Sequence, residues 1–194
     1  MSQFSIRTIA VVLFGLIVLA GCGDPPAPKT QIVGARTPSP VAQLTPPDPF
    51  GPRYEATLAE GIDFRKPGYP GFIAEVAGMS GYEPDWRWSD AAAGDVVKFR
   101  FKQALPKNIK LEITVNAYGP NLGEPVKVRF GNVEKTFMHK DPSSPGTYTL
   151  VFETVNGGDT IEIVPPKPAR PSEIASSPDT RRLGVAFYAL RIPE

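Results

Sequence analysis

Apolar and polar residues alternate with a period of two along most of the chain after residue 95. Val97, Phe99 and Phe101 alternate with lysine and arginine, which predicts a strand with one buried and one solvated face. Further strand patterns, the first two weaker, lie at 61–64, 72–77, 109–116, 126–130, 133–137, 147–153, 160–164 and 183–192. The chain therefore carries about eight or nine short strands.

Turn signals separate these strands. Gly131-Asn132 stands between two of them and predicts a two-residue hairpin loop, and the glycines Gly157 and Gly158 are expected to form a second hairpin turn. No amphipathic helical periodicity accompanies the strands, and 23 prolines oppose a mostly helical fold. Antiparallel strands without crossover helices predict an all-β domain over 54–194, a jelly roll or β-sandwich. The Pro- and Ser-rich stretch 165–182 is expected to be a binding loop or a mobile flap.

An uninterrupted apolar run occupies residues 9–20. Twelve helical residues rise only about 18 Å, which is too short for a hydrocarbon core of about 30 Å, so the run predicts a signal peptide over 1–21. The sequence LAGC that ends at Cys22 resembles the lipobox of bacterial lipoproteins. In that family the cysteine thiol carries a diacylglycerol. A plain secretory signal with an unrelated cysteine is the alternative, but Cys22 is the only cysteine of the chain and stands at the required place.

The lipobox resemblance implies a protein anchored in the cell membrane through the acylated Cys22 and facing the periplasm. Gly23 rather than aspartate follows the cysteine, which favours the outer membrane if the source is Gram-negative. The stretch 22–53 holds nine prolines and no periodic apolar pattern, so it is expected to be a disordered linker. A passive spacer is favoured over a Pro-rich recognition motif.

Composition excludes several classes of site. One cysteine and one histidine, His139, exclude disulfide frameworks, Cys-rich zinc or iron–sulfur centres and multi-histidine metal sites. A formal charge of +1 provides no overall positive field for nucleic acid. No phosphate-binding or dinucleotide-binding glycine motif is present. No cofactor and no nucleic-acid partner are therefore expected, and a structural calcium held by loop carboxylates is left open.

The strongest candidate site is an aromatic and polar cluster within nine residues. It combines aromatic faces for the C–H patches of a sugar with charged groups for its hydroxyls, and it comprises Tyr82, Trp86, Arg87, Trp88 and Asp90. In a strand, Trp86 and Trp88 would share one face, with Arg87 opposite. Alternatively, Arg87 pairs with a neighbouring carboxylate of Asp85 or Asp90. Trp88 is expected to belong to the core, whereas Trp86 is equally compatible with core and ligand.

Two loops carry further candidates. Tyr118 and Asn121 stand at a strand end, where an amide could bond a sugar hydroxyl, although a turn that only shapes the chain explains them as well. Arg181 and Arg182 follow Asp179 on the long loop, where a guanidinium such as that of Arg182 could meet an anionic glycan or phosphate. A solvated charge cluster is the favoured alternative for this loop.

Catalysis has little support in the sequence. His139, Asp141 and Ser143 lie close together, but a catalytic triad is defined by geometry and not by proximity along the chain. Glu83 and Asp90 could hydrolyse glycosides only if they faced one cleft about 5 to 9 Å apart. We therefore expect no catalytic residues and no enzyme activity.

Several short motifs, in order, resemble those of the C-terminal β domain of bacterial phosphoglycerol transferase I, an enzyme that decorates periplasmic glucans. They are IDF at 62–64, GMSG at 78–81, RWSD at 87–90, AYGPN at 117–121 and RRLG at 181–184. The resemblance covers about 60–192 and implies a jelly-roll accessory domain of the envelope with no activity of its own. The family commonly has Trp-Gly before the RW pair, whereas this chain has Asp85-Trp86, which puts the role of that aromatic in doubt.

These features favour a lipid-anchored, non-catalytic envelope accessory protein with a glycan-binding β-sandwich, linked to periplasmic glucan or surface glycan metabolism. The alternative is an assembly lipoprotein that docks onto envelope machinery, and a small glycoside-active enzyme ranks last. A groove lined by Trp86 and Arg87 would favour the first hypothesis. A flat exposed apolar patch would favour the second.

Overall fold

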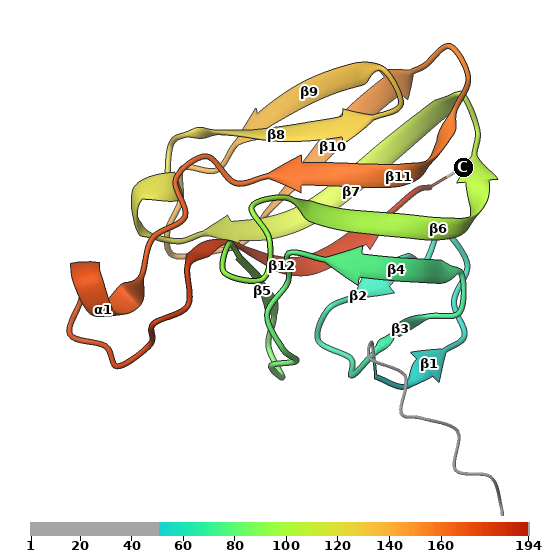
Figure 1. The fold of residues 1–194 in the computed structure, drawn as a ribbon. Helices are drawn as coiled ribbons and strands as arrows, with labels where there is room; N and C mark the ends of the chain where they lie inside the picture. Colours follow the sequence, from blue (N-terminus) through green and yellow to red (C-terminus); the bar gives the residue numbers. More distant parts are fainter. Residues whose placement is uncertain (1–50, 194) are drawn as a thin grey trace, which may run out of the picture. The chain divides into compact units, whose positions relative to one another are not determined.

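The computed structural model describes residues 51–193, which form two five-stranded β-sheets (Figure 1). The first sheet has the order β10-β7-β12-β2, with β5 also paired to β12, and the second has the order β4-β6-β11-β8-β9. The predicted signal peptide, Cys22 and the linker up to residue 50 lie outside the described residues. β1 begins at Arg53, one residue before the expected start of the domain.

The strand bounds follow the predicted alternation closely. The first sheet contains β2 (Ile62–Asp63), β5 (Arg87–Asp90), β7 (Asn108–Ala117), β10 (Gly146–Glu153) and β12 (Leu183–Arg191). The second contains β4 (Ile73–Ala77), β6 (Val97–Leu105), β8 (Pro125–Phe130), β9 (Val133–Met138) and β11 (Gly158–Val164). The remaining elements are β1 (Arg53–Tyr54), which pairs in parallel with β3 (Tyr69–Pro70), the 3-10 helix η1 (Gly119–Asn121) and the helix α1 (Pro171–Ile174).

The core lies between the two sheets. Phe99 of β6 in the second sheet and Phe187 of β12 in the first are both fully buried, with ring centroids 6.2 Å apart. Phe64, which follows β2, contacts both of them at 5.6 and 5.4 Å. Aromatic side chains from opposite sheets thus interdigitate, as in a β-sandwich. The predicted all-β sandwich is confirmed, and so is the assignment of Phe99 to its buried face.

The two predicted hairpin turns have different outcomes. Phe130 pairs with Val133 across the two-residue loop between β8 and β9, so the first hairpin is confirmed. The second is wrong, because β10 pairs with β7 in one sheet whereas β11 pairs with β6 and β8 in the other. The segment around Gly157 crosses between the sheets. Gly157 has a positive φ, and a Cβ on this residue would stand 2.5 Å from the carbonyl oxygen of Leu105. Both features require glycine at this position.

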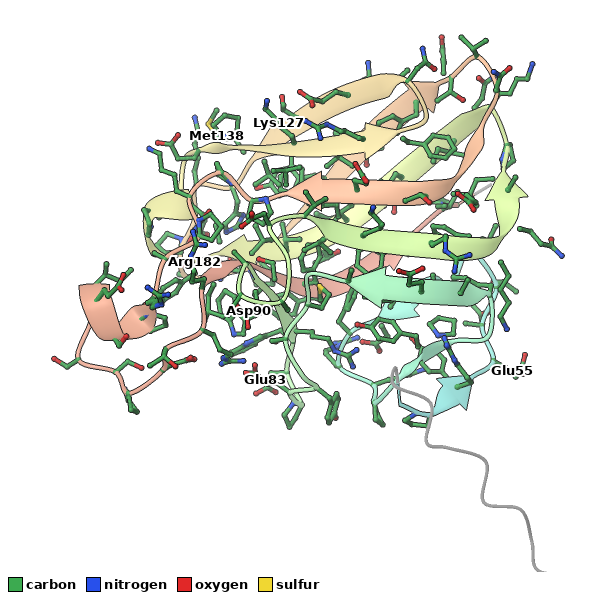
Figure 2. All side chains as sticks on the ribbon, in the orientation of Figure 1. Glu55, Glu83, Asp90, Lys127, Met138 and Arg182 are labelled. Carbon is green, nitrogen blue, oxygen red and sulfur yellow. The ribbon has the colours of Figure 1, made fainter. Side chains whose placement is uncertain are left out.

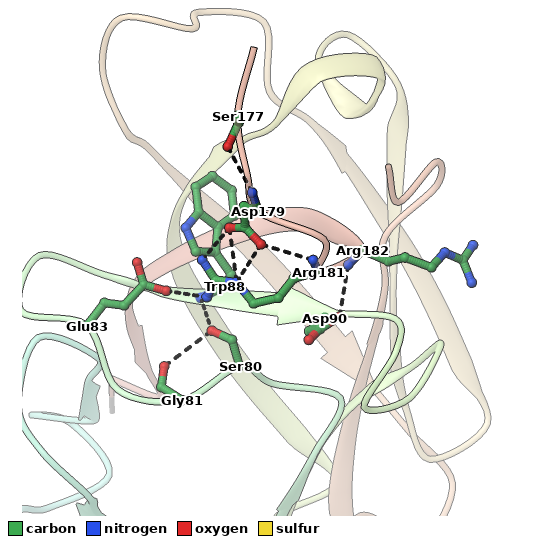
Figure 3. Close-up of polar contacts among 9 residues, drawn as sticks. All are labelled: Ser80, Gly81, Glu83, Trp88, Asp90, Ser177, Asp179, Arg181 and Arg182. Atoms are coloured by element: carbon green, nitrogen blue, oxygen red, sulfur yellow. Dashed lines mark hydrogen bonds and ion pairs between the residues drawn. The ribbon is translucent and has the colours of Figure 1, made fainter. Parts of the chain in front are cut away.

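β5 joins the edges of the two sheets. It pairs with β12, while the amide of Ser80 donates to the carbonyl of Trp88 and the amide of Asp90 donates to the carbonyl of Gly78, directly after β4. The side chain of Ser80 also accepts a hydrogen bond from the amide of Trp88 (Figure 3). This double attachment holds the segment that carries the predicted aromatic and polar cluster.

Candidate functional site

Four aromatic side chains form a continuous row beside β5. Tyr118, Trp88, Trp86 and Tyr188 contact one another in that order, with ring centroids 5.7, 6.2 and 5.9 Å apart. All four are partly exposed, and none belongs to the buried core cluster. We call these four residues the aromatic row.

The pairing of β5 with β12 explains how the row forms. Trp88 stands opposite Ala186, and Trp86 lies two residues earlier on the same face. The register of β12 against β7 shifts between Phe187 and Ala189, which leaves Tyr188 as the extra residue of a bulge. A bulge of this kind re-aims a side chain, and here the ring of Tyr188 meets Trp86.

Polar groups continue the same sheet face. Ala186 pairs with Asn116 of β7, so Trp88, Ala186 and Asn116 lie in one line across three strands. Asn116 donates to the carbonyl of Pro142 at 3.3 Å and accepts from the amide of Ala117 at 2.7 Å. Between β7 and β10, the hydroxyls of Thr114 and Thr147 lie 2.9 Å apart. Hydroxyl and amide groups therefore stand beside the aromatic row.

The structure corrects one expectation about this cluster. The sequence predicts Trp88 in the core, but Trp88 lies on the outer face of the first sheet with Trp86, and it is only partly buried. The reason is the strand period, since Ser89 and Arg87 take the buried positions on either side of it. The predicted sharing of one face by the two tryptophans is borne out by their ring contact.

Arg87 lies away from the aromatic row. Its side chain is 3% exposed, its guanidinium carbon stands 4.5 Å from the ring centroid of Tyr69 and 5.7 Å from that of Tyr82, and its Nη2 donates to the carbonyl of Lys66 at 3.2 Å. Within residues 51–193 it forms no ion pair, so the alternative in which it pairs with a neighbouring carboxylate is wrong. Arg87 lines a cavity of about 500 Å³ in which Trp86 has no part, so the two do not line one groove.

Asp90 and Arg182 adjoin at the start of β12 (Figure 2). Asp90 is buried, and one carboxylate oxygen accepts from the amides of Ala92 at 2.9 Å and Arg182 at 3.1 Å. The guanidinium of Arg182 is more exposed and lies 3.9 Å from Asp95. Asp90 therefore stabilises the backbone here, while Arg182 presents its charge to solvent.

Arg181 bridges two loops (Figure 3). Its guanidinium donates to Glu83 at 2.6 Å and to Asp179 at 2.7 Å, so its charge is matched by carboxylates. The guanidinium lowers the pKa of Asp179 below its ordinary value. Glu83 is thereby committed to Arg181, whereas Asp90 bonds the backbone. The two carboxylates that a glycosidase would need are engaged with different partners.

Asn121 is fully buried and all of its polar atoms are used. Its Nδ2 donates to the carbonyls of Tyr118 and Lys167, and its Oδ1 accepts from the amide of Lys167, each at 2.9 Å. It fastens η1 to the long loop before β12. The structure therefore brings Tyr118 into the aromatic row, while Asn121 lies outside the row and bonds the backbone of Tyr118. Tyr82, the remaining candidate, is exposed at the cavity of Arg87, and its hydroxyl donates to the carbonyl of Arg65.

His139, Asp141 and Ser143 do not form a triad. His139 is buried, with Nδ1 beside the hydroxyl of Tyr148 at 2.9 Å and Nε2 on the backbone carbonyl of Asp141. The carboxylate of Asp141 instead accepts from the hydroxyls of Ser143 and Ser144, which lower its pKa to about 2. Across the part of the chain that the structure describes, no group of three metal-binding side chains converges.

Sequence reasoning missed three groups of the site. Tyr188 joins the row only through the β12 bulge, and Asn116 and Thr114 reach its face only through strand pairing. The break in alternation at Phe187-Tyr188 was the one local signal available for Tyr188.

No helix between residues 51 and 193 has the length and apolar character needed to cross a membrane.

Comparison with known proteins identifies a family and several longer proteins that are similar to this chain. The family described as "Domain of unknown function (DUF7024)" matches residues 51–194. The proteins named "Phosphoglycerol transferase I" from Escherichia coli O139:H28 (strain E24377A / ETEC) and from Shigella boydii serotype 18 are each 37% identical over 139 residues. That match covers 70% of this chain but 18% of each relative, so the chain spans less than a fifth of their length.

Solved structures with a similar arrangement include family 29 carbohydrate binding modules. One such module matches with 12% sequence identity and a TM-score of 0.44, over 68% of this chain and 83% of that module. A mutant of the module CBM29-2 complexed with cellulohexaose matches with 13% identity and a TM-score of 0.45, over 67% of this chain and 86% of the module.

Proposed function

This chain belongs to the family described as "Domain of unknown function (DUF7024)", and from that premise we propose that its β-sandwich is a glycan-binding accessory module of the bacterial cell envelope. The module binds its ligand on the aromatic row, has no catalytic activity of its own and is held at the membrane by a lipid on Cys22. The row is the observation that carries this proposal.

The chemistry of the row suits a sugar chain. Partly exposed aromatic rings offer apolar faces to the C–H patches of pyranose rings, and they contribute contact area at low entropic cost. Trp86 and Trp88 stand at the centre of the row, with Tyr118 and Tyr188 at its ends. The hydroxyls of Thr114 and Thr147 on the same sheet can exchange hydrogen bonds with sugar hydroxyls.

The relatives support the envelope and glycan parts of the proposal. They are named as transferases of phosphoglycerol, and the present chain corresponds to 18% of their length. We infer that the shared segment holds the glycan that such an enzyme modifies, while the transfer chemistry belongs to the rest of the longer relatives. In this chain the same module would present or retain a glycan at the membrane surface.

The docking alternative would need a contiguous apolar surface. The exposed large apolar side chains within residues 51–193 come from separate parts of the fold and are Tyr82, Met138, Val151, Val155 and Ile174. The aromatic row is a more coherent surface, so it favours the glycan ligand over a protein partner.

Titration calorimetry with neutral β-glucan oligosaccharides tests the binding function. Trp86→Ala in the full-length chain is expected to weaken binding by more than tenfold, about 1.4 kcal/mol. Tyr82→Ala is the matched control, since Tyr82 is an exposed aromatic outside the row, and it should leave neutral-glycan binding unchanged. If the wild type binds no neutral glycan at millimolar concentration, the docking-lipoprotein hypothesis replaces this one.

The anchor has its own test. Cys22→Ser should abolish incorporation of labelled palmitate and release the protein from membranes or leave its signal uncleaved. Unchanged labelling in the variant would refute lipidation at Cys22. The oligosaccharide titration is unaffected by this result, so the two parts of the proposal stand or fall separately.

A further inference from the structure

Arg87 differs from the other arginines in how its charge is matched. Seven other arginines within residues 51–193 lie within 4.0 Å of a carboxylate oxygen, for example Arg181 with Glu83. Arg87 has no such partner, although it is 3% exposed. Its Nε is buried without a hydrogen-bond acceptor, and its Nη2 reaches only the carbonyl of Lys66.

The surroundings of Arg87 do not supply a counter-charge. The face of Tyr69, 4.5 Å from the guanidinium carbon, attracts the cation, but a ring face cannot accept the hydrogen bond that Nε offers in the plane of the guanidinium. Burial raises the pKa of Tyr69, so its phenol stays neutral at physiological pH. A buried, uncompensated charge is costly to maintain and calls for an explanation.

Arg87 borders a cavity large enough for a small ligand. The cavity has a volume of about 500 Å³, and its walls include Tyr69, Tyr82 and the glycine-rich turn 78–81. A Cβ at Gly81 would meet no atom within 4 Å, so this wall leaves open space. Tyr82 is exposed at the cavity, and its ring also faces the guanidinium at 5.7 Å. The volume lies in the range of small-molecule sites, about 300 to 1,000 Å³.

We infer that this cavity is an anion-binding site, in which the guanidinium of Arg87 receives an oxyanion, phosphate or carboxylate, carried on a small polyol or sugar. The in-plane donors of a guanidinium match the oxygens of such groups, and the guanidinium of Arg87, which lines this cavity, has no carboxylate partner among residues 51–193. The site goes beyond the proposed function, because the aromatic row contributes no residue to this cavity. A neutral sugar chain and an oxyanion would therefore bind separately.

Titration of the full-length chain with three anions tests the inference. The probes are inorganic phosphate, glycerol phosphate and glucuronate, with glucose as the neutral control. The wild type should bind at least one anion with an affinity that falls as salt is added, and the Nε–H resonance of Arg87 should shift on binding. Glucose should cause no shift. The anion that binds identifies whether a phosphate or a carboxylate carrier is the natural source.

Arg87→Met removes the charge and keeps a side chain of similar length, so it should reduce anion binding by at least tenfold. Tyr82→Phe keeps the ring over the guanidinium and should bind as the wild type does. The wild-type resonance keeps the test decisive even if Arg87→Met does not fold. An unshifted Nε–H signal with all three anions at millimolar concentration, or equal binding by wild type and Arg87→Met, would overturn the inference. Trp86→Ala should retain anion binding, which separates this result from the fate of the proposed glycan function.

Discussion

The two faces of the first sheet use aromatic residues in opposite ways. On the inner face, Phe187 and its neighbours Phe64 and Phe99 are fully buried and hold the two sheets together. On the outer face, Trp86 and Trp88 contact each other but stay partly exposed. The same residue class therefore supports stability on one face and forms the proposed binding surface on the other. Burial, and not residue type, distinguishes the two roles.

The strongest test of this comparison is a truncation on the inner face. Phe99→Ala should lower the free energy of unfolding by about 3 to 5 kcal/mol, because the ring is fully buried between the sheets and its removal leaves a cavity. Chemical denaturation measures the loss. Phe99→Leu, which keeps most of the apolar volume, should cost clearly less. A loss below about 1 kcal/mol for the alanine variant would mean that the inner face does not carry the stability assigned to it.

Asn121 is buried next to the outer face, and its side chain bonds the backbone carbonyl of Tyr118, a member of the aromatic row. Asn121→Ala should cost about 2 to 3 kcal/mol, because it leaves the amide and the carbonyl of Lys167 without the side chain that bonds them and removes one of the two hydrogen bonds on the carbonyl of Tyr118. Asn108→Ala, at an exposed amide side chain, is the matched control and should change stability by less than about 0.5 kcal/mol. Thermal and chemical unfolding compare the two. Equal losses would show that the buried network contributes nothing special.

On the outer face, Trp88→Ala should have a smaller effect on stability than Phe99→Ala. A loss of about 1 to 2 kcal/mol is expected, because the indole is only partly buried and the change removes its ring contacts with Trp86 and Tyr118. Glycan binding should fall more than tenfold in the same variant. A stability loss as large as that of Phe99→Ala, with binding retained, would assign Trp88 to packing after all.

The smallest effect is expected at the turn beside the outer face, where Pro142 accepts a hydrogen bond from Asn116. Asp141 in this turn has its pKa lowered to about 2 by the hydroxyls of Ser143 and Ser144. Because the folded pKa lies below the unfolded one, the contribution of Asp141 is present above about pH 4 and is lost as pH falls through 2. A titration followed by NMR should give a midpoint near 2 for Asp141. In Ser143→Ala it should move upward, and an unchanged midpoint would contradict this account.

The sequence predicted the regular part of the fold well because that information is local. Alternation at Val97, Phe99 and Phe101 marks a strand wherever the strand pairs, and two residues between Phe130 and Val133 suffice for a hairpin. Around Gly157 the same kind of turn signal misled, since turn residues specify a bend but not which sheet the next strand joins. Pairing partners are a property of the whole chain.

The candidate site was predictable in composition but not in arrangement. By itself the sequence determined that Trp86 and Trp88 share a face opposite Arg87, because the period of a strand requires it. Only the tertiary structure decided which face is buried, since that depends on β5 pairing with β12 and on the bulge that brings Tyr188 into the row. It also decided that Arg87 lacks a carboxylate partner, because the residues around its guanidinium come from segments far apart in the chain, and their approach depends on the packing of the two sheets.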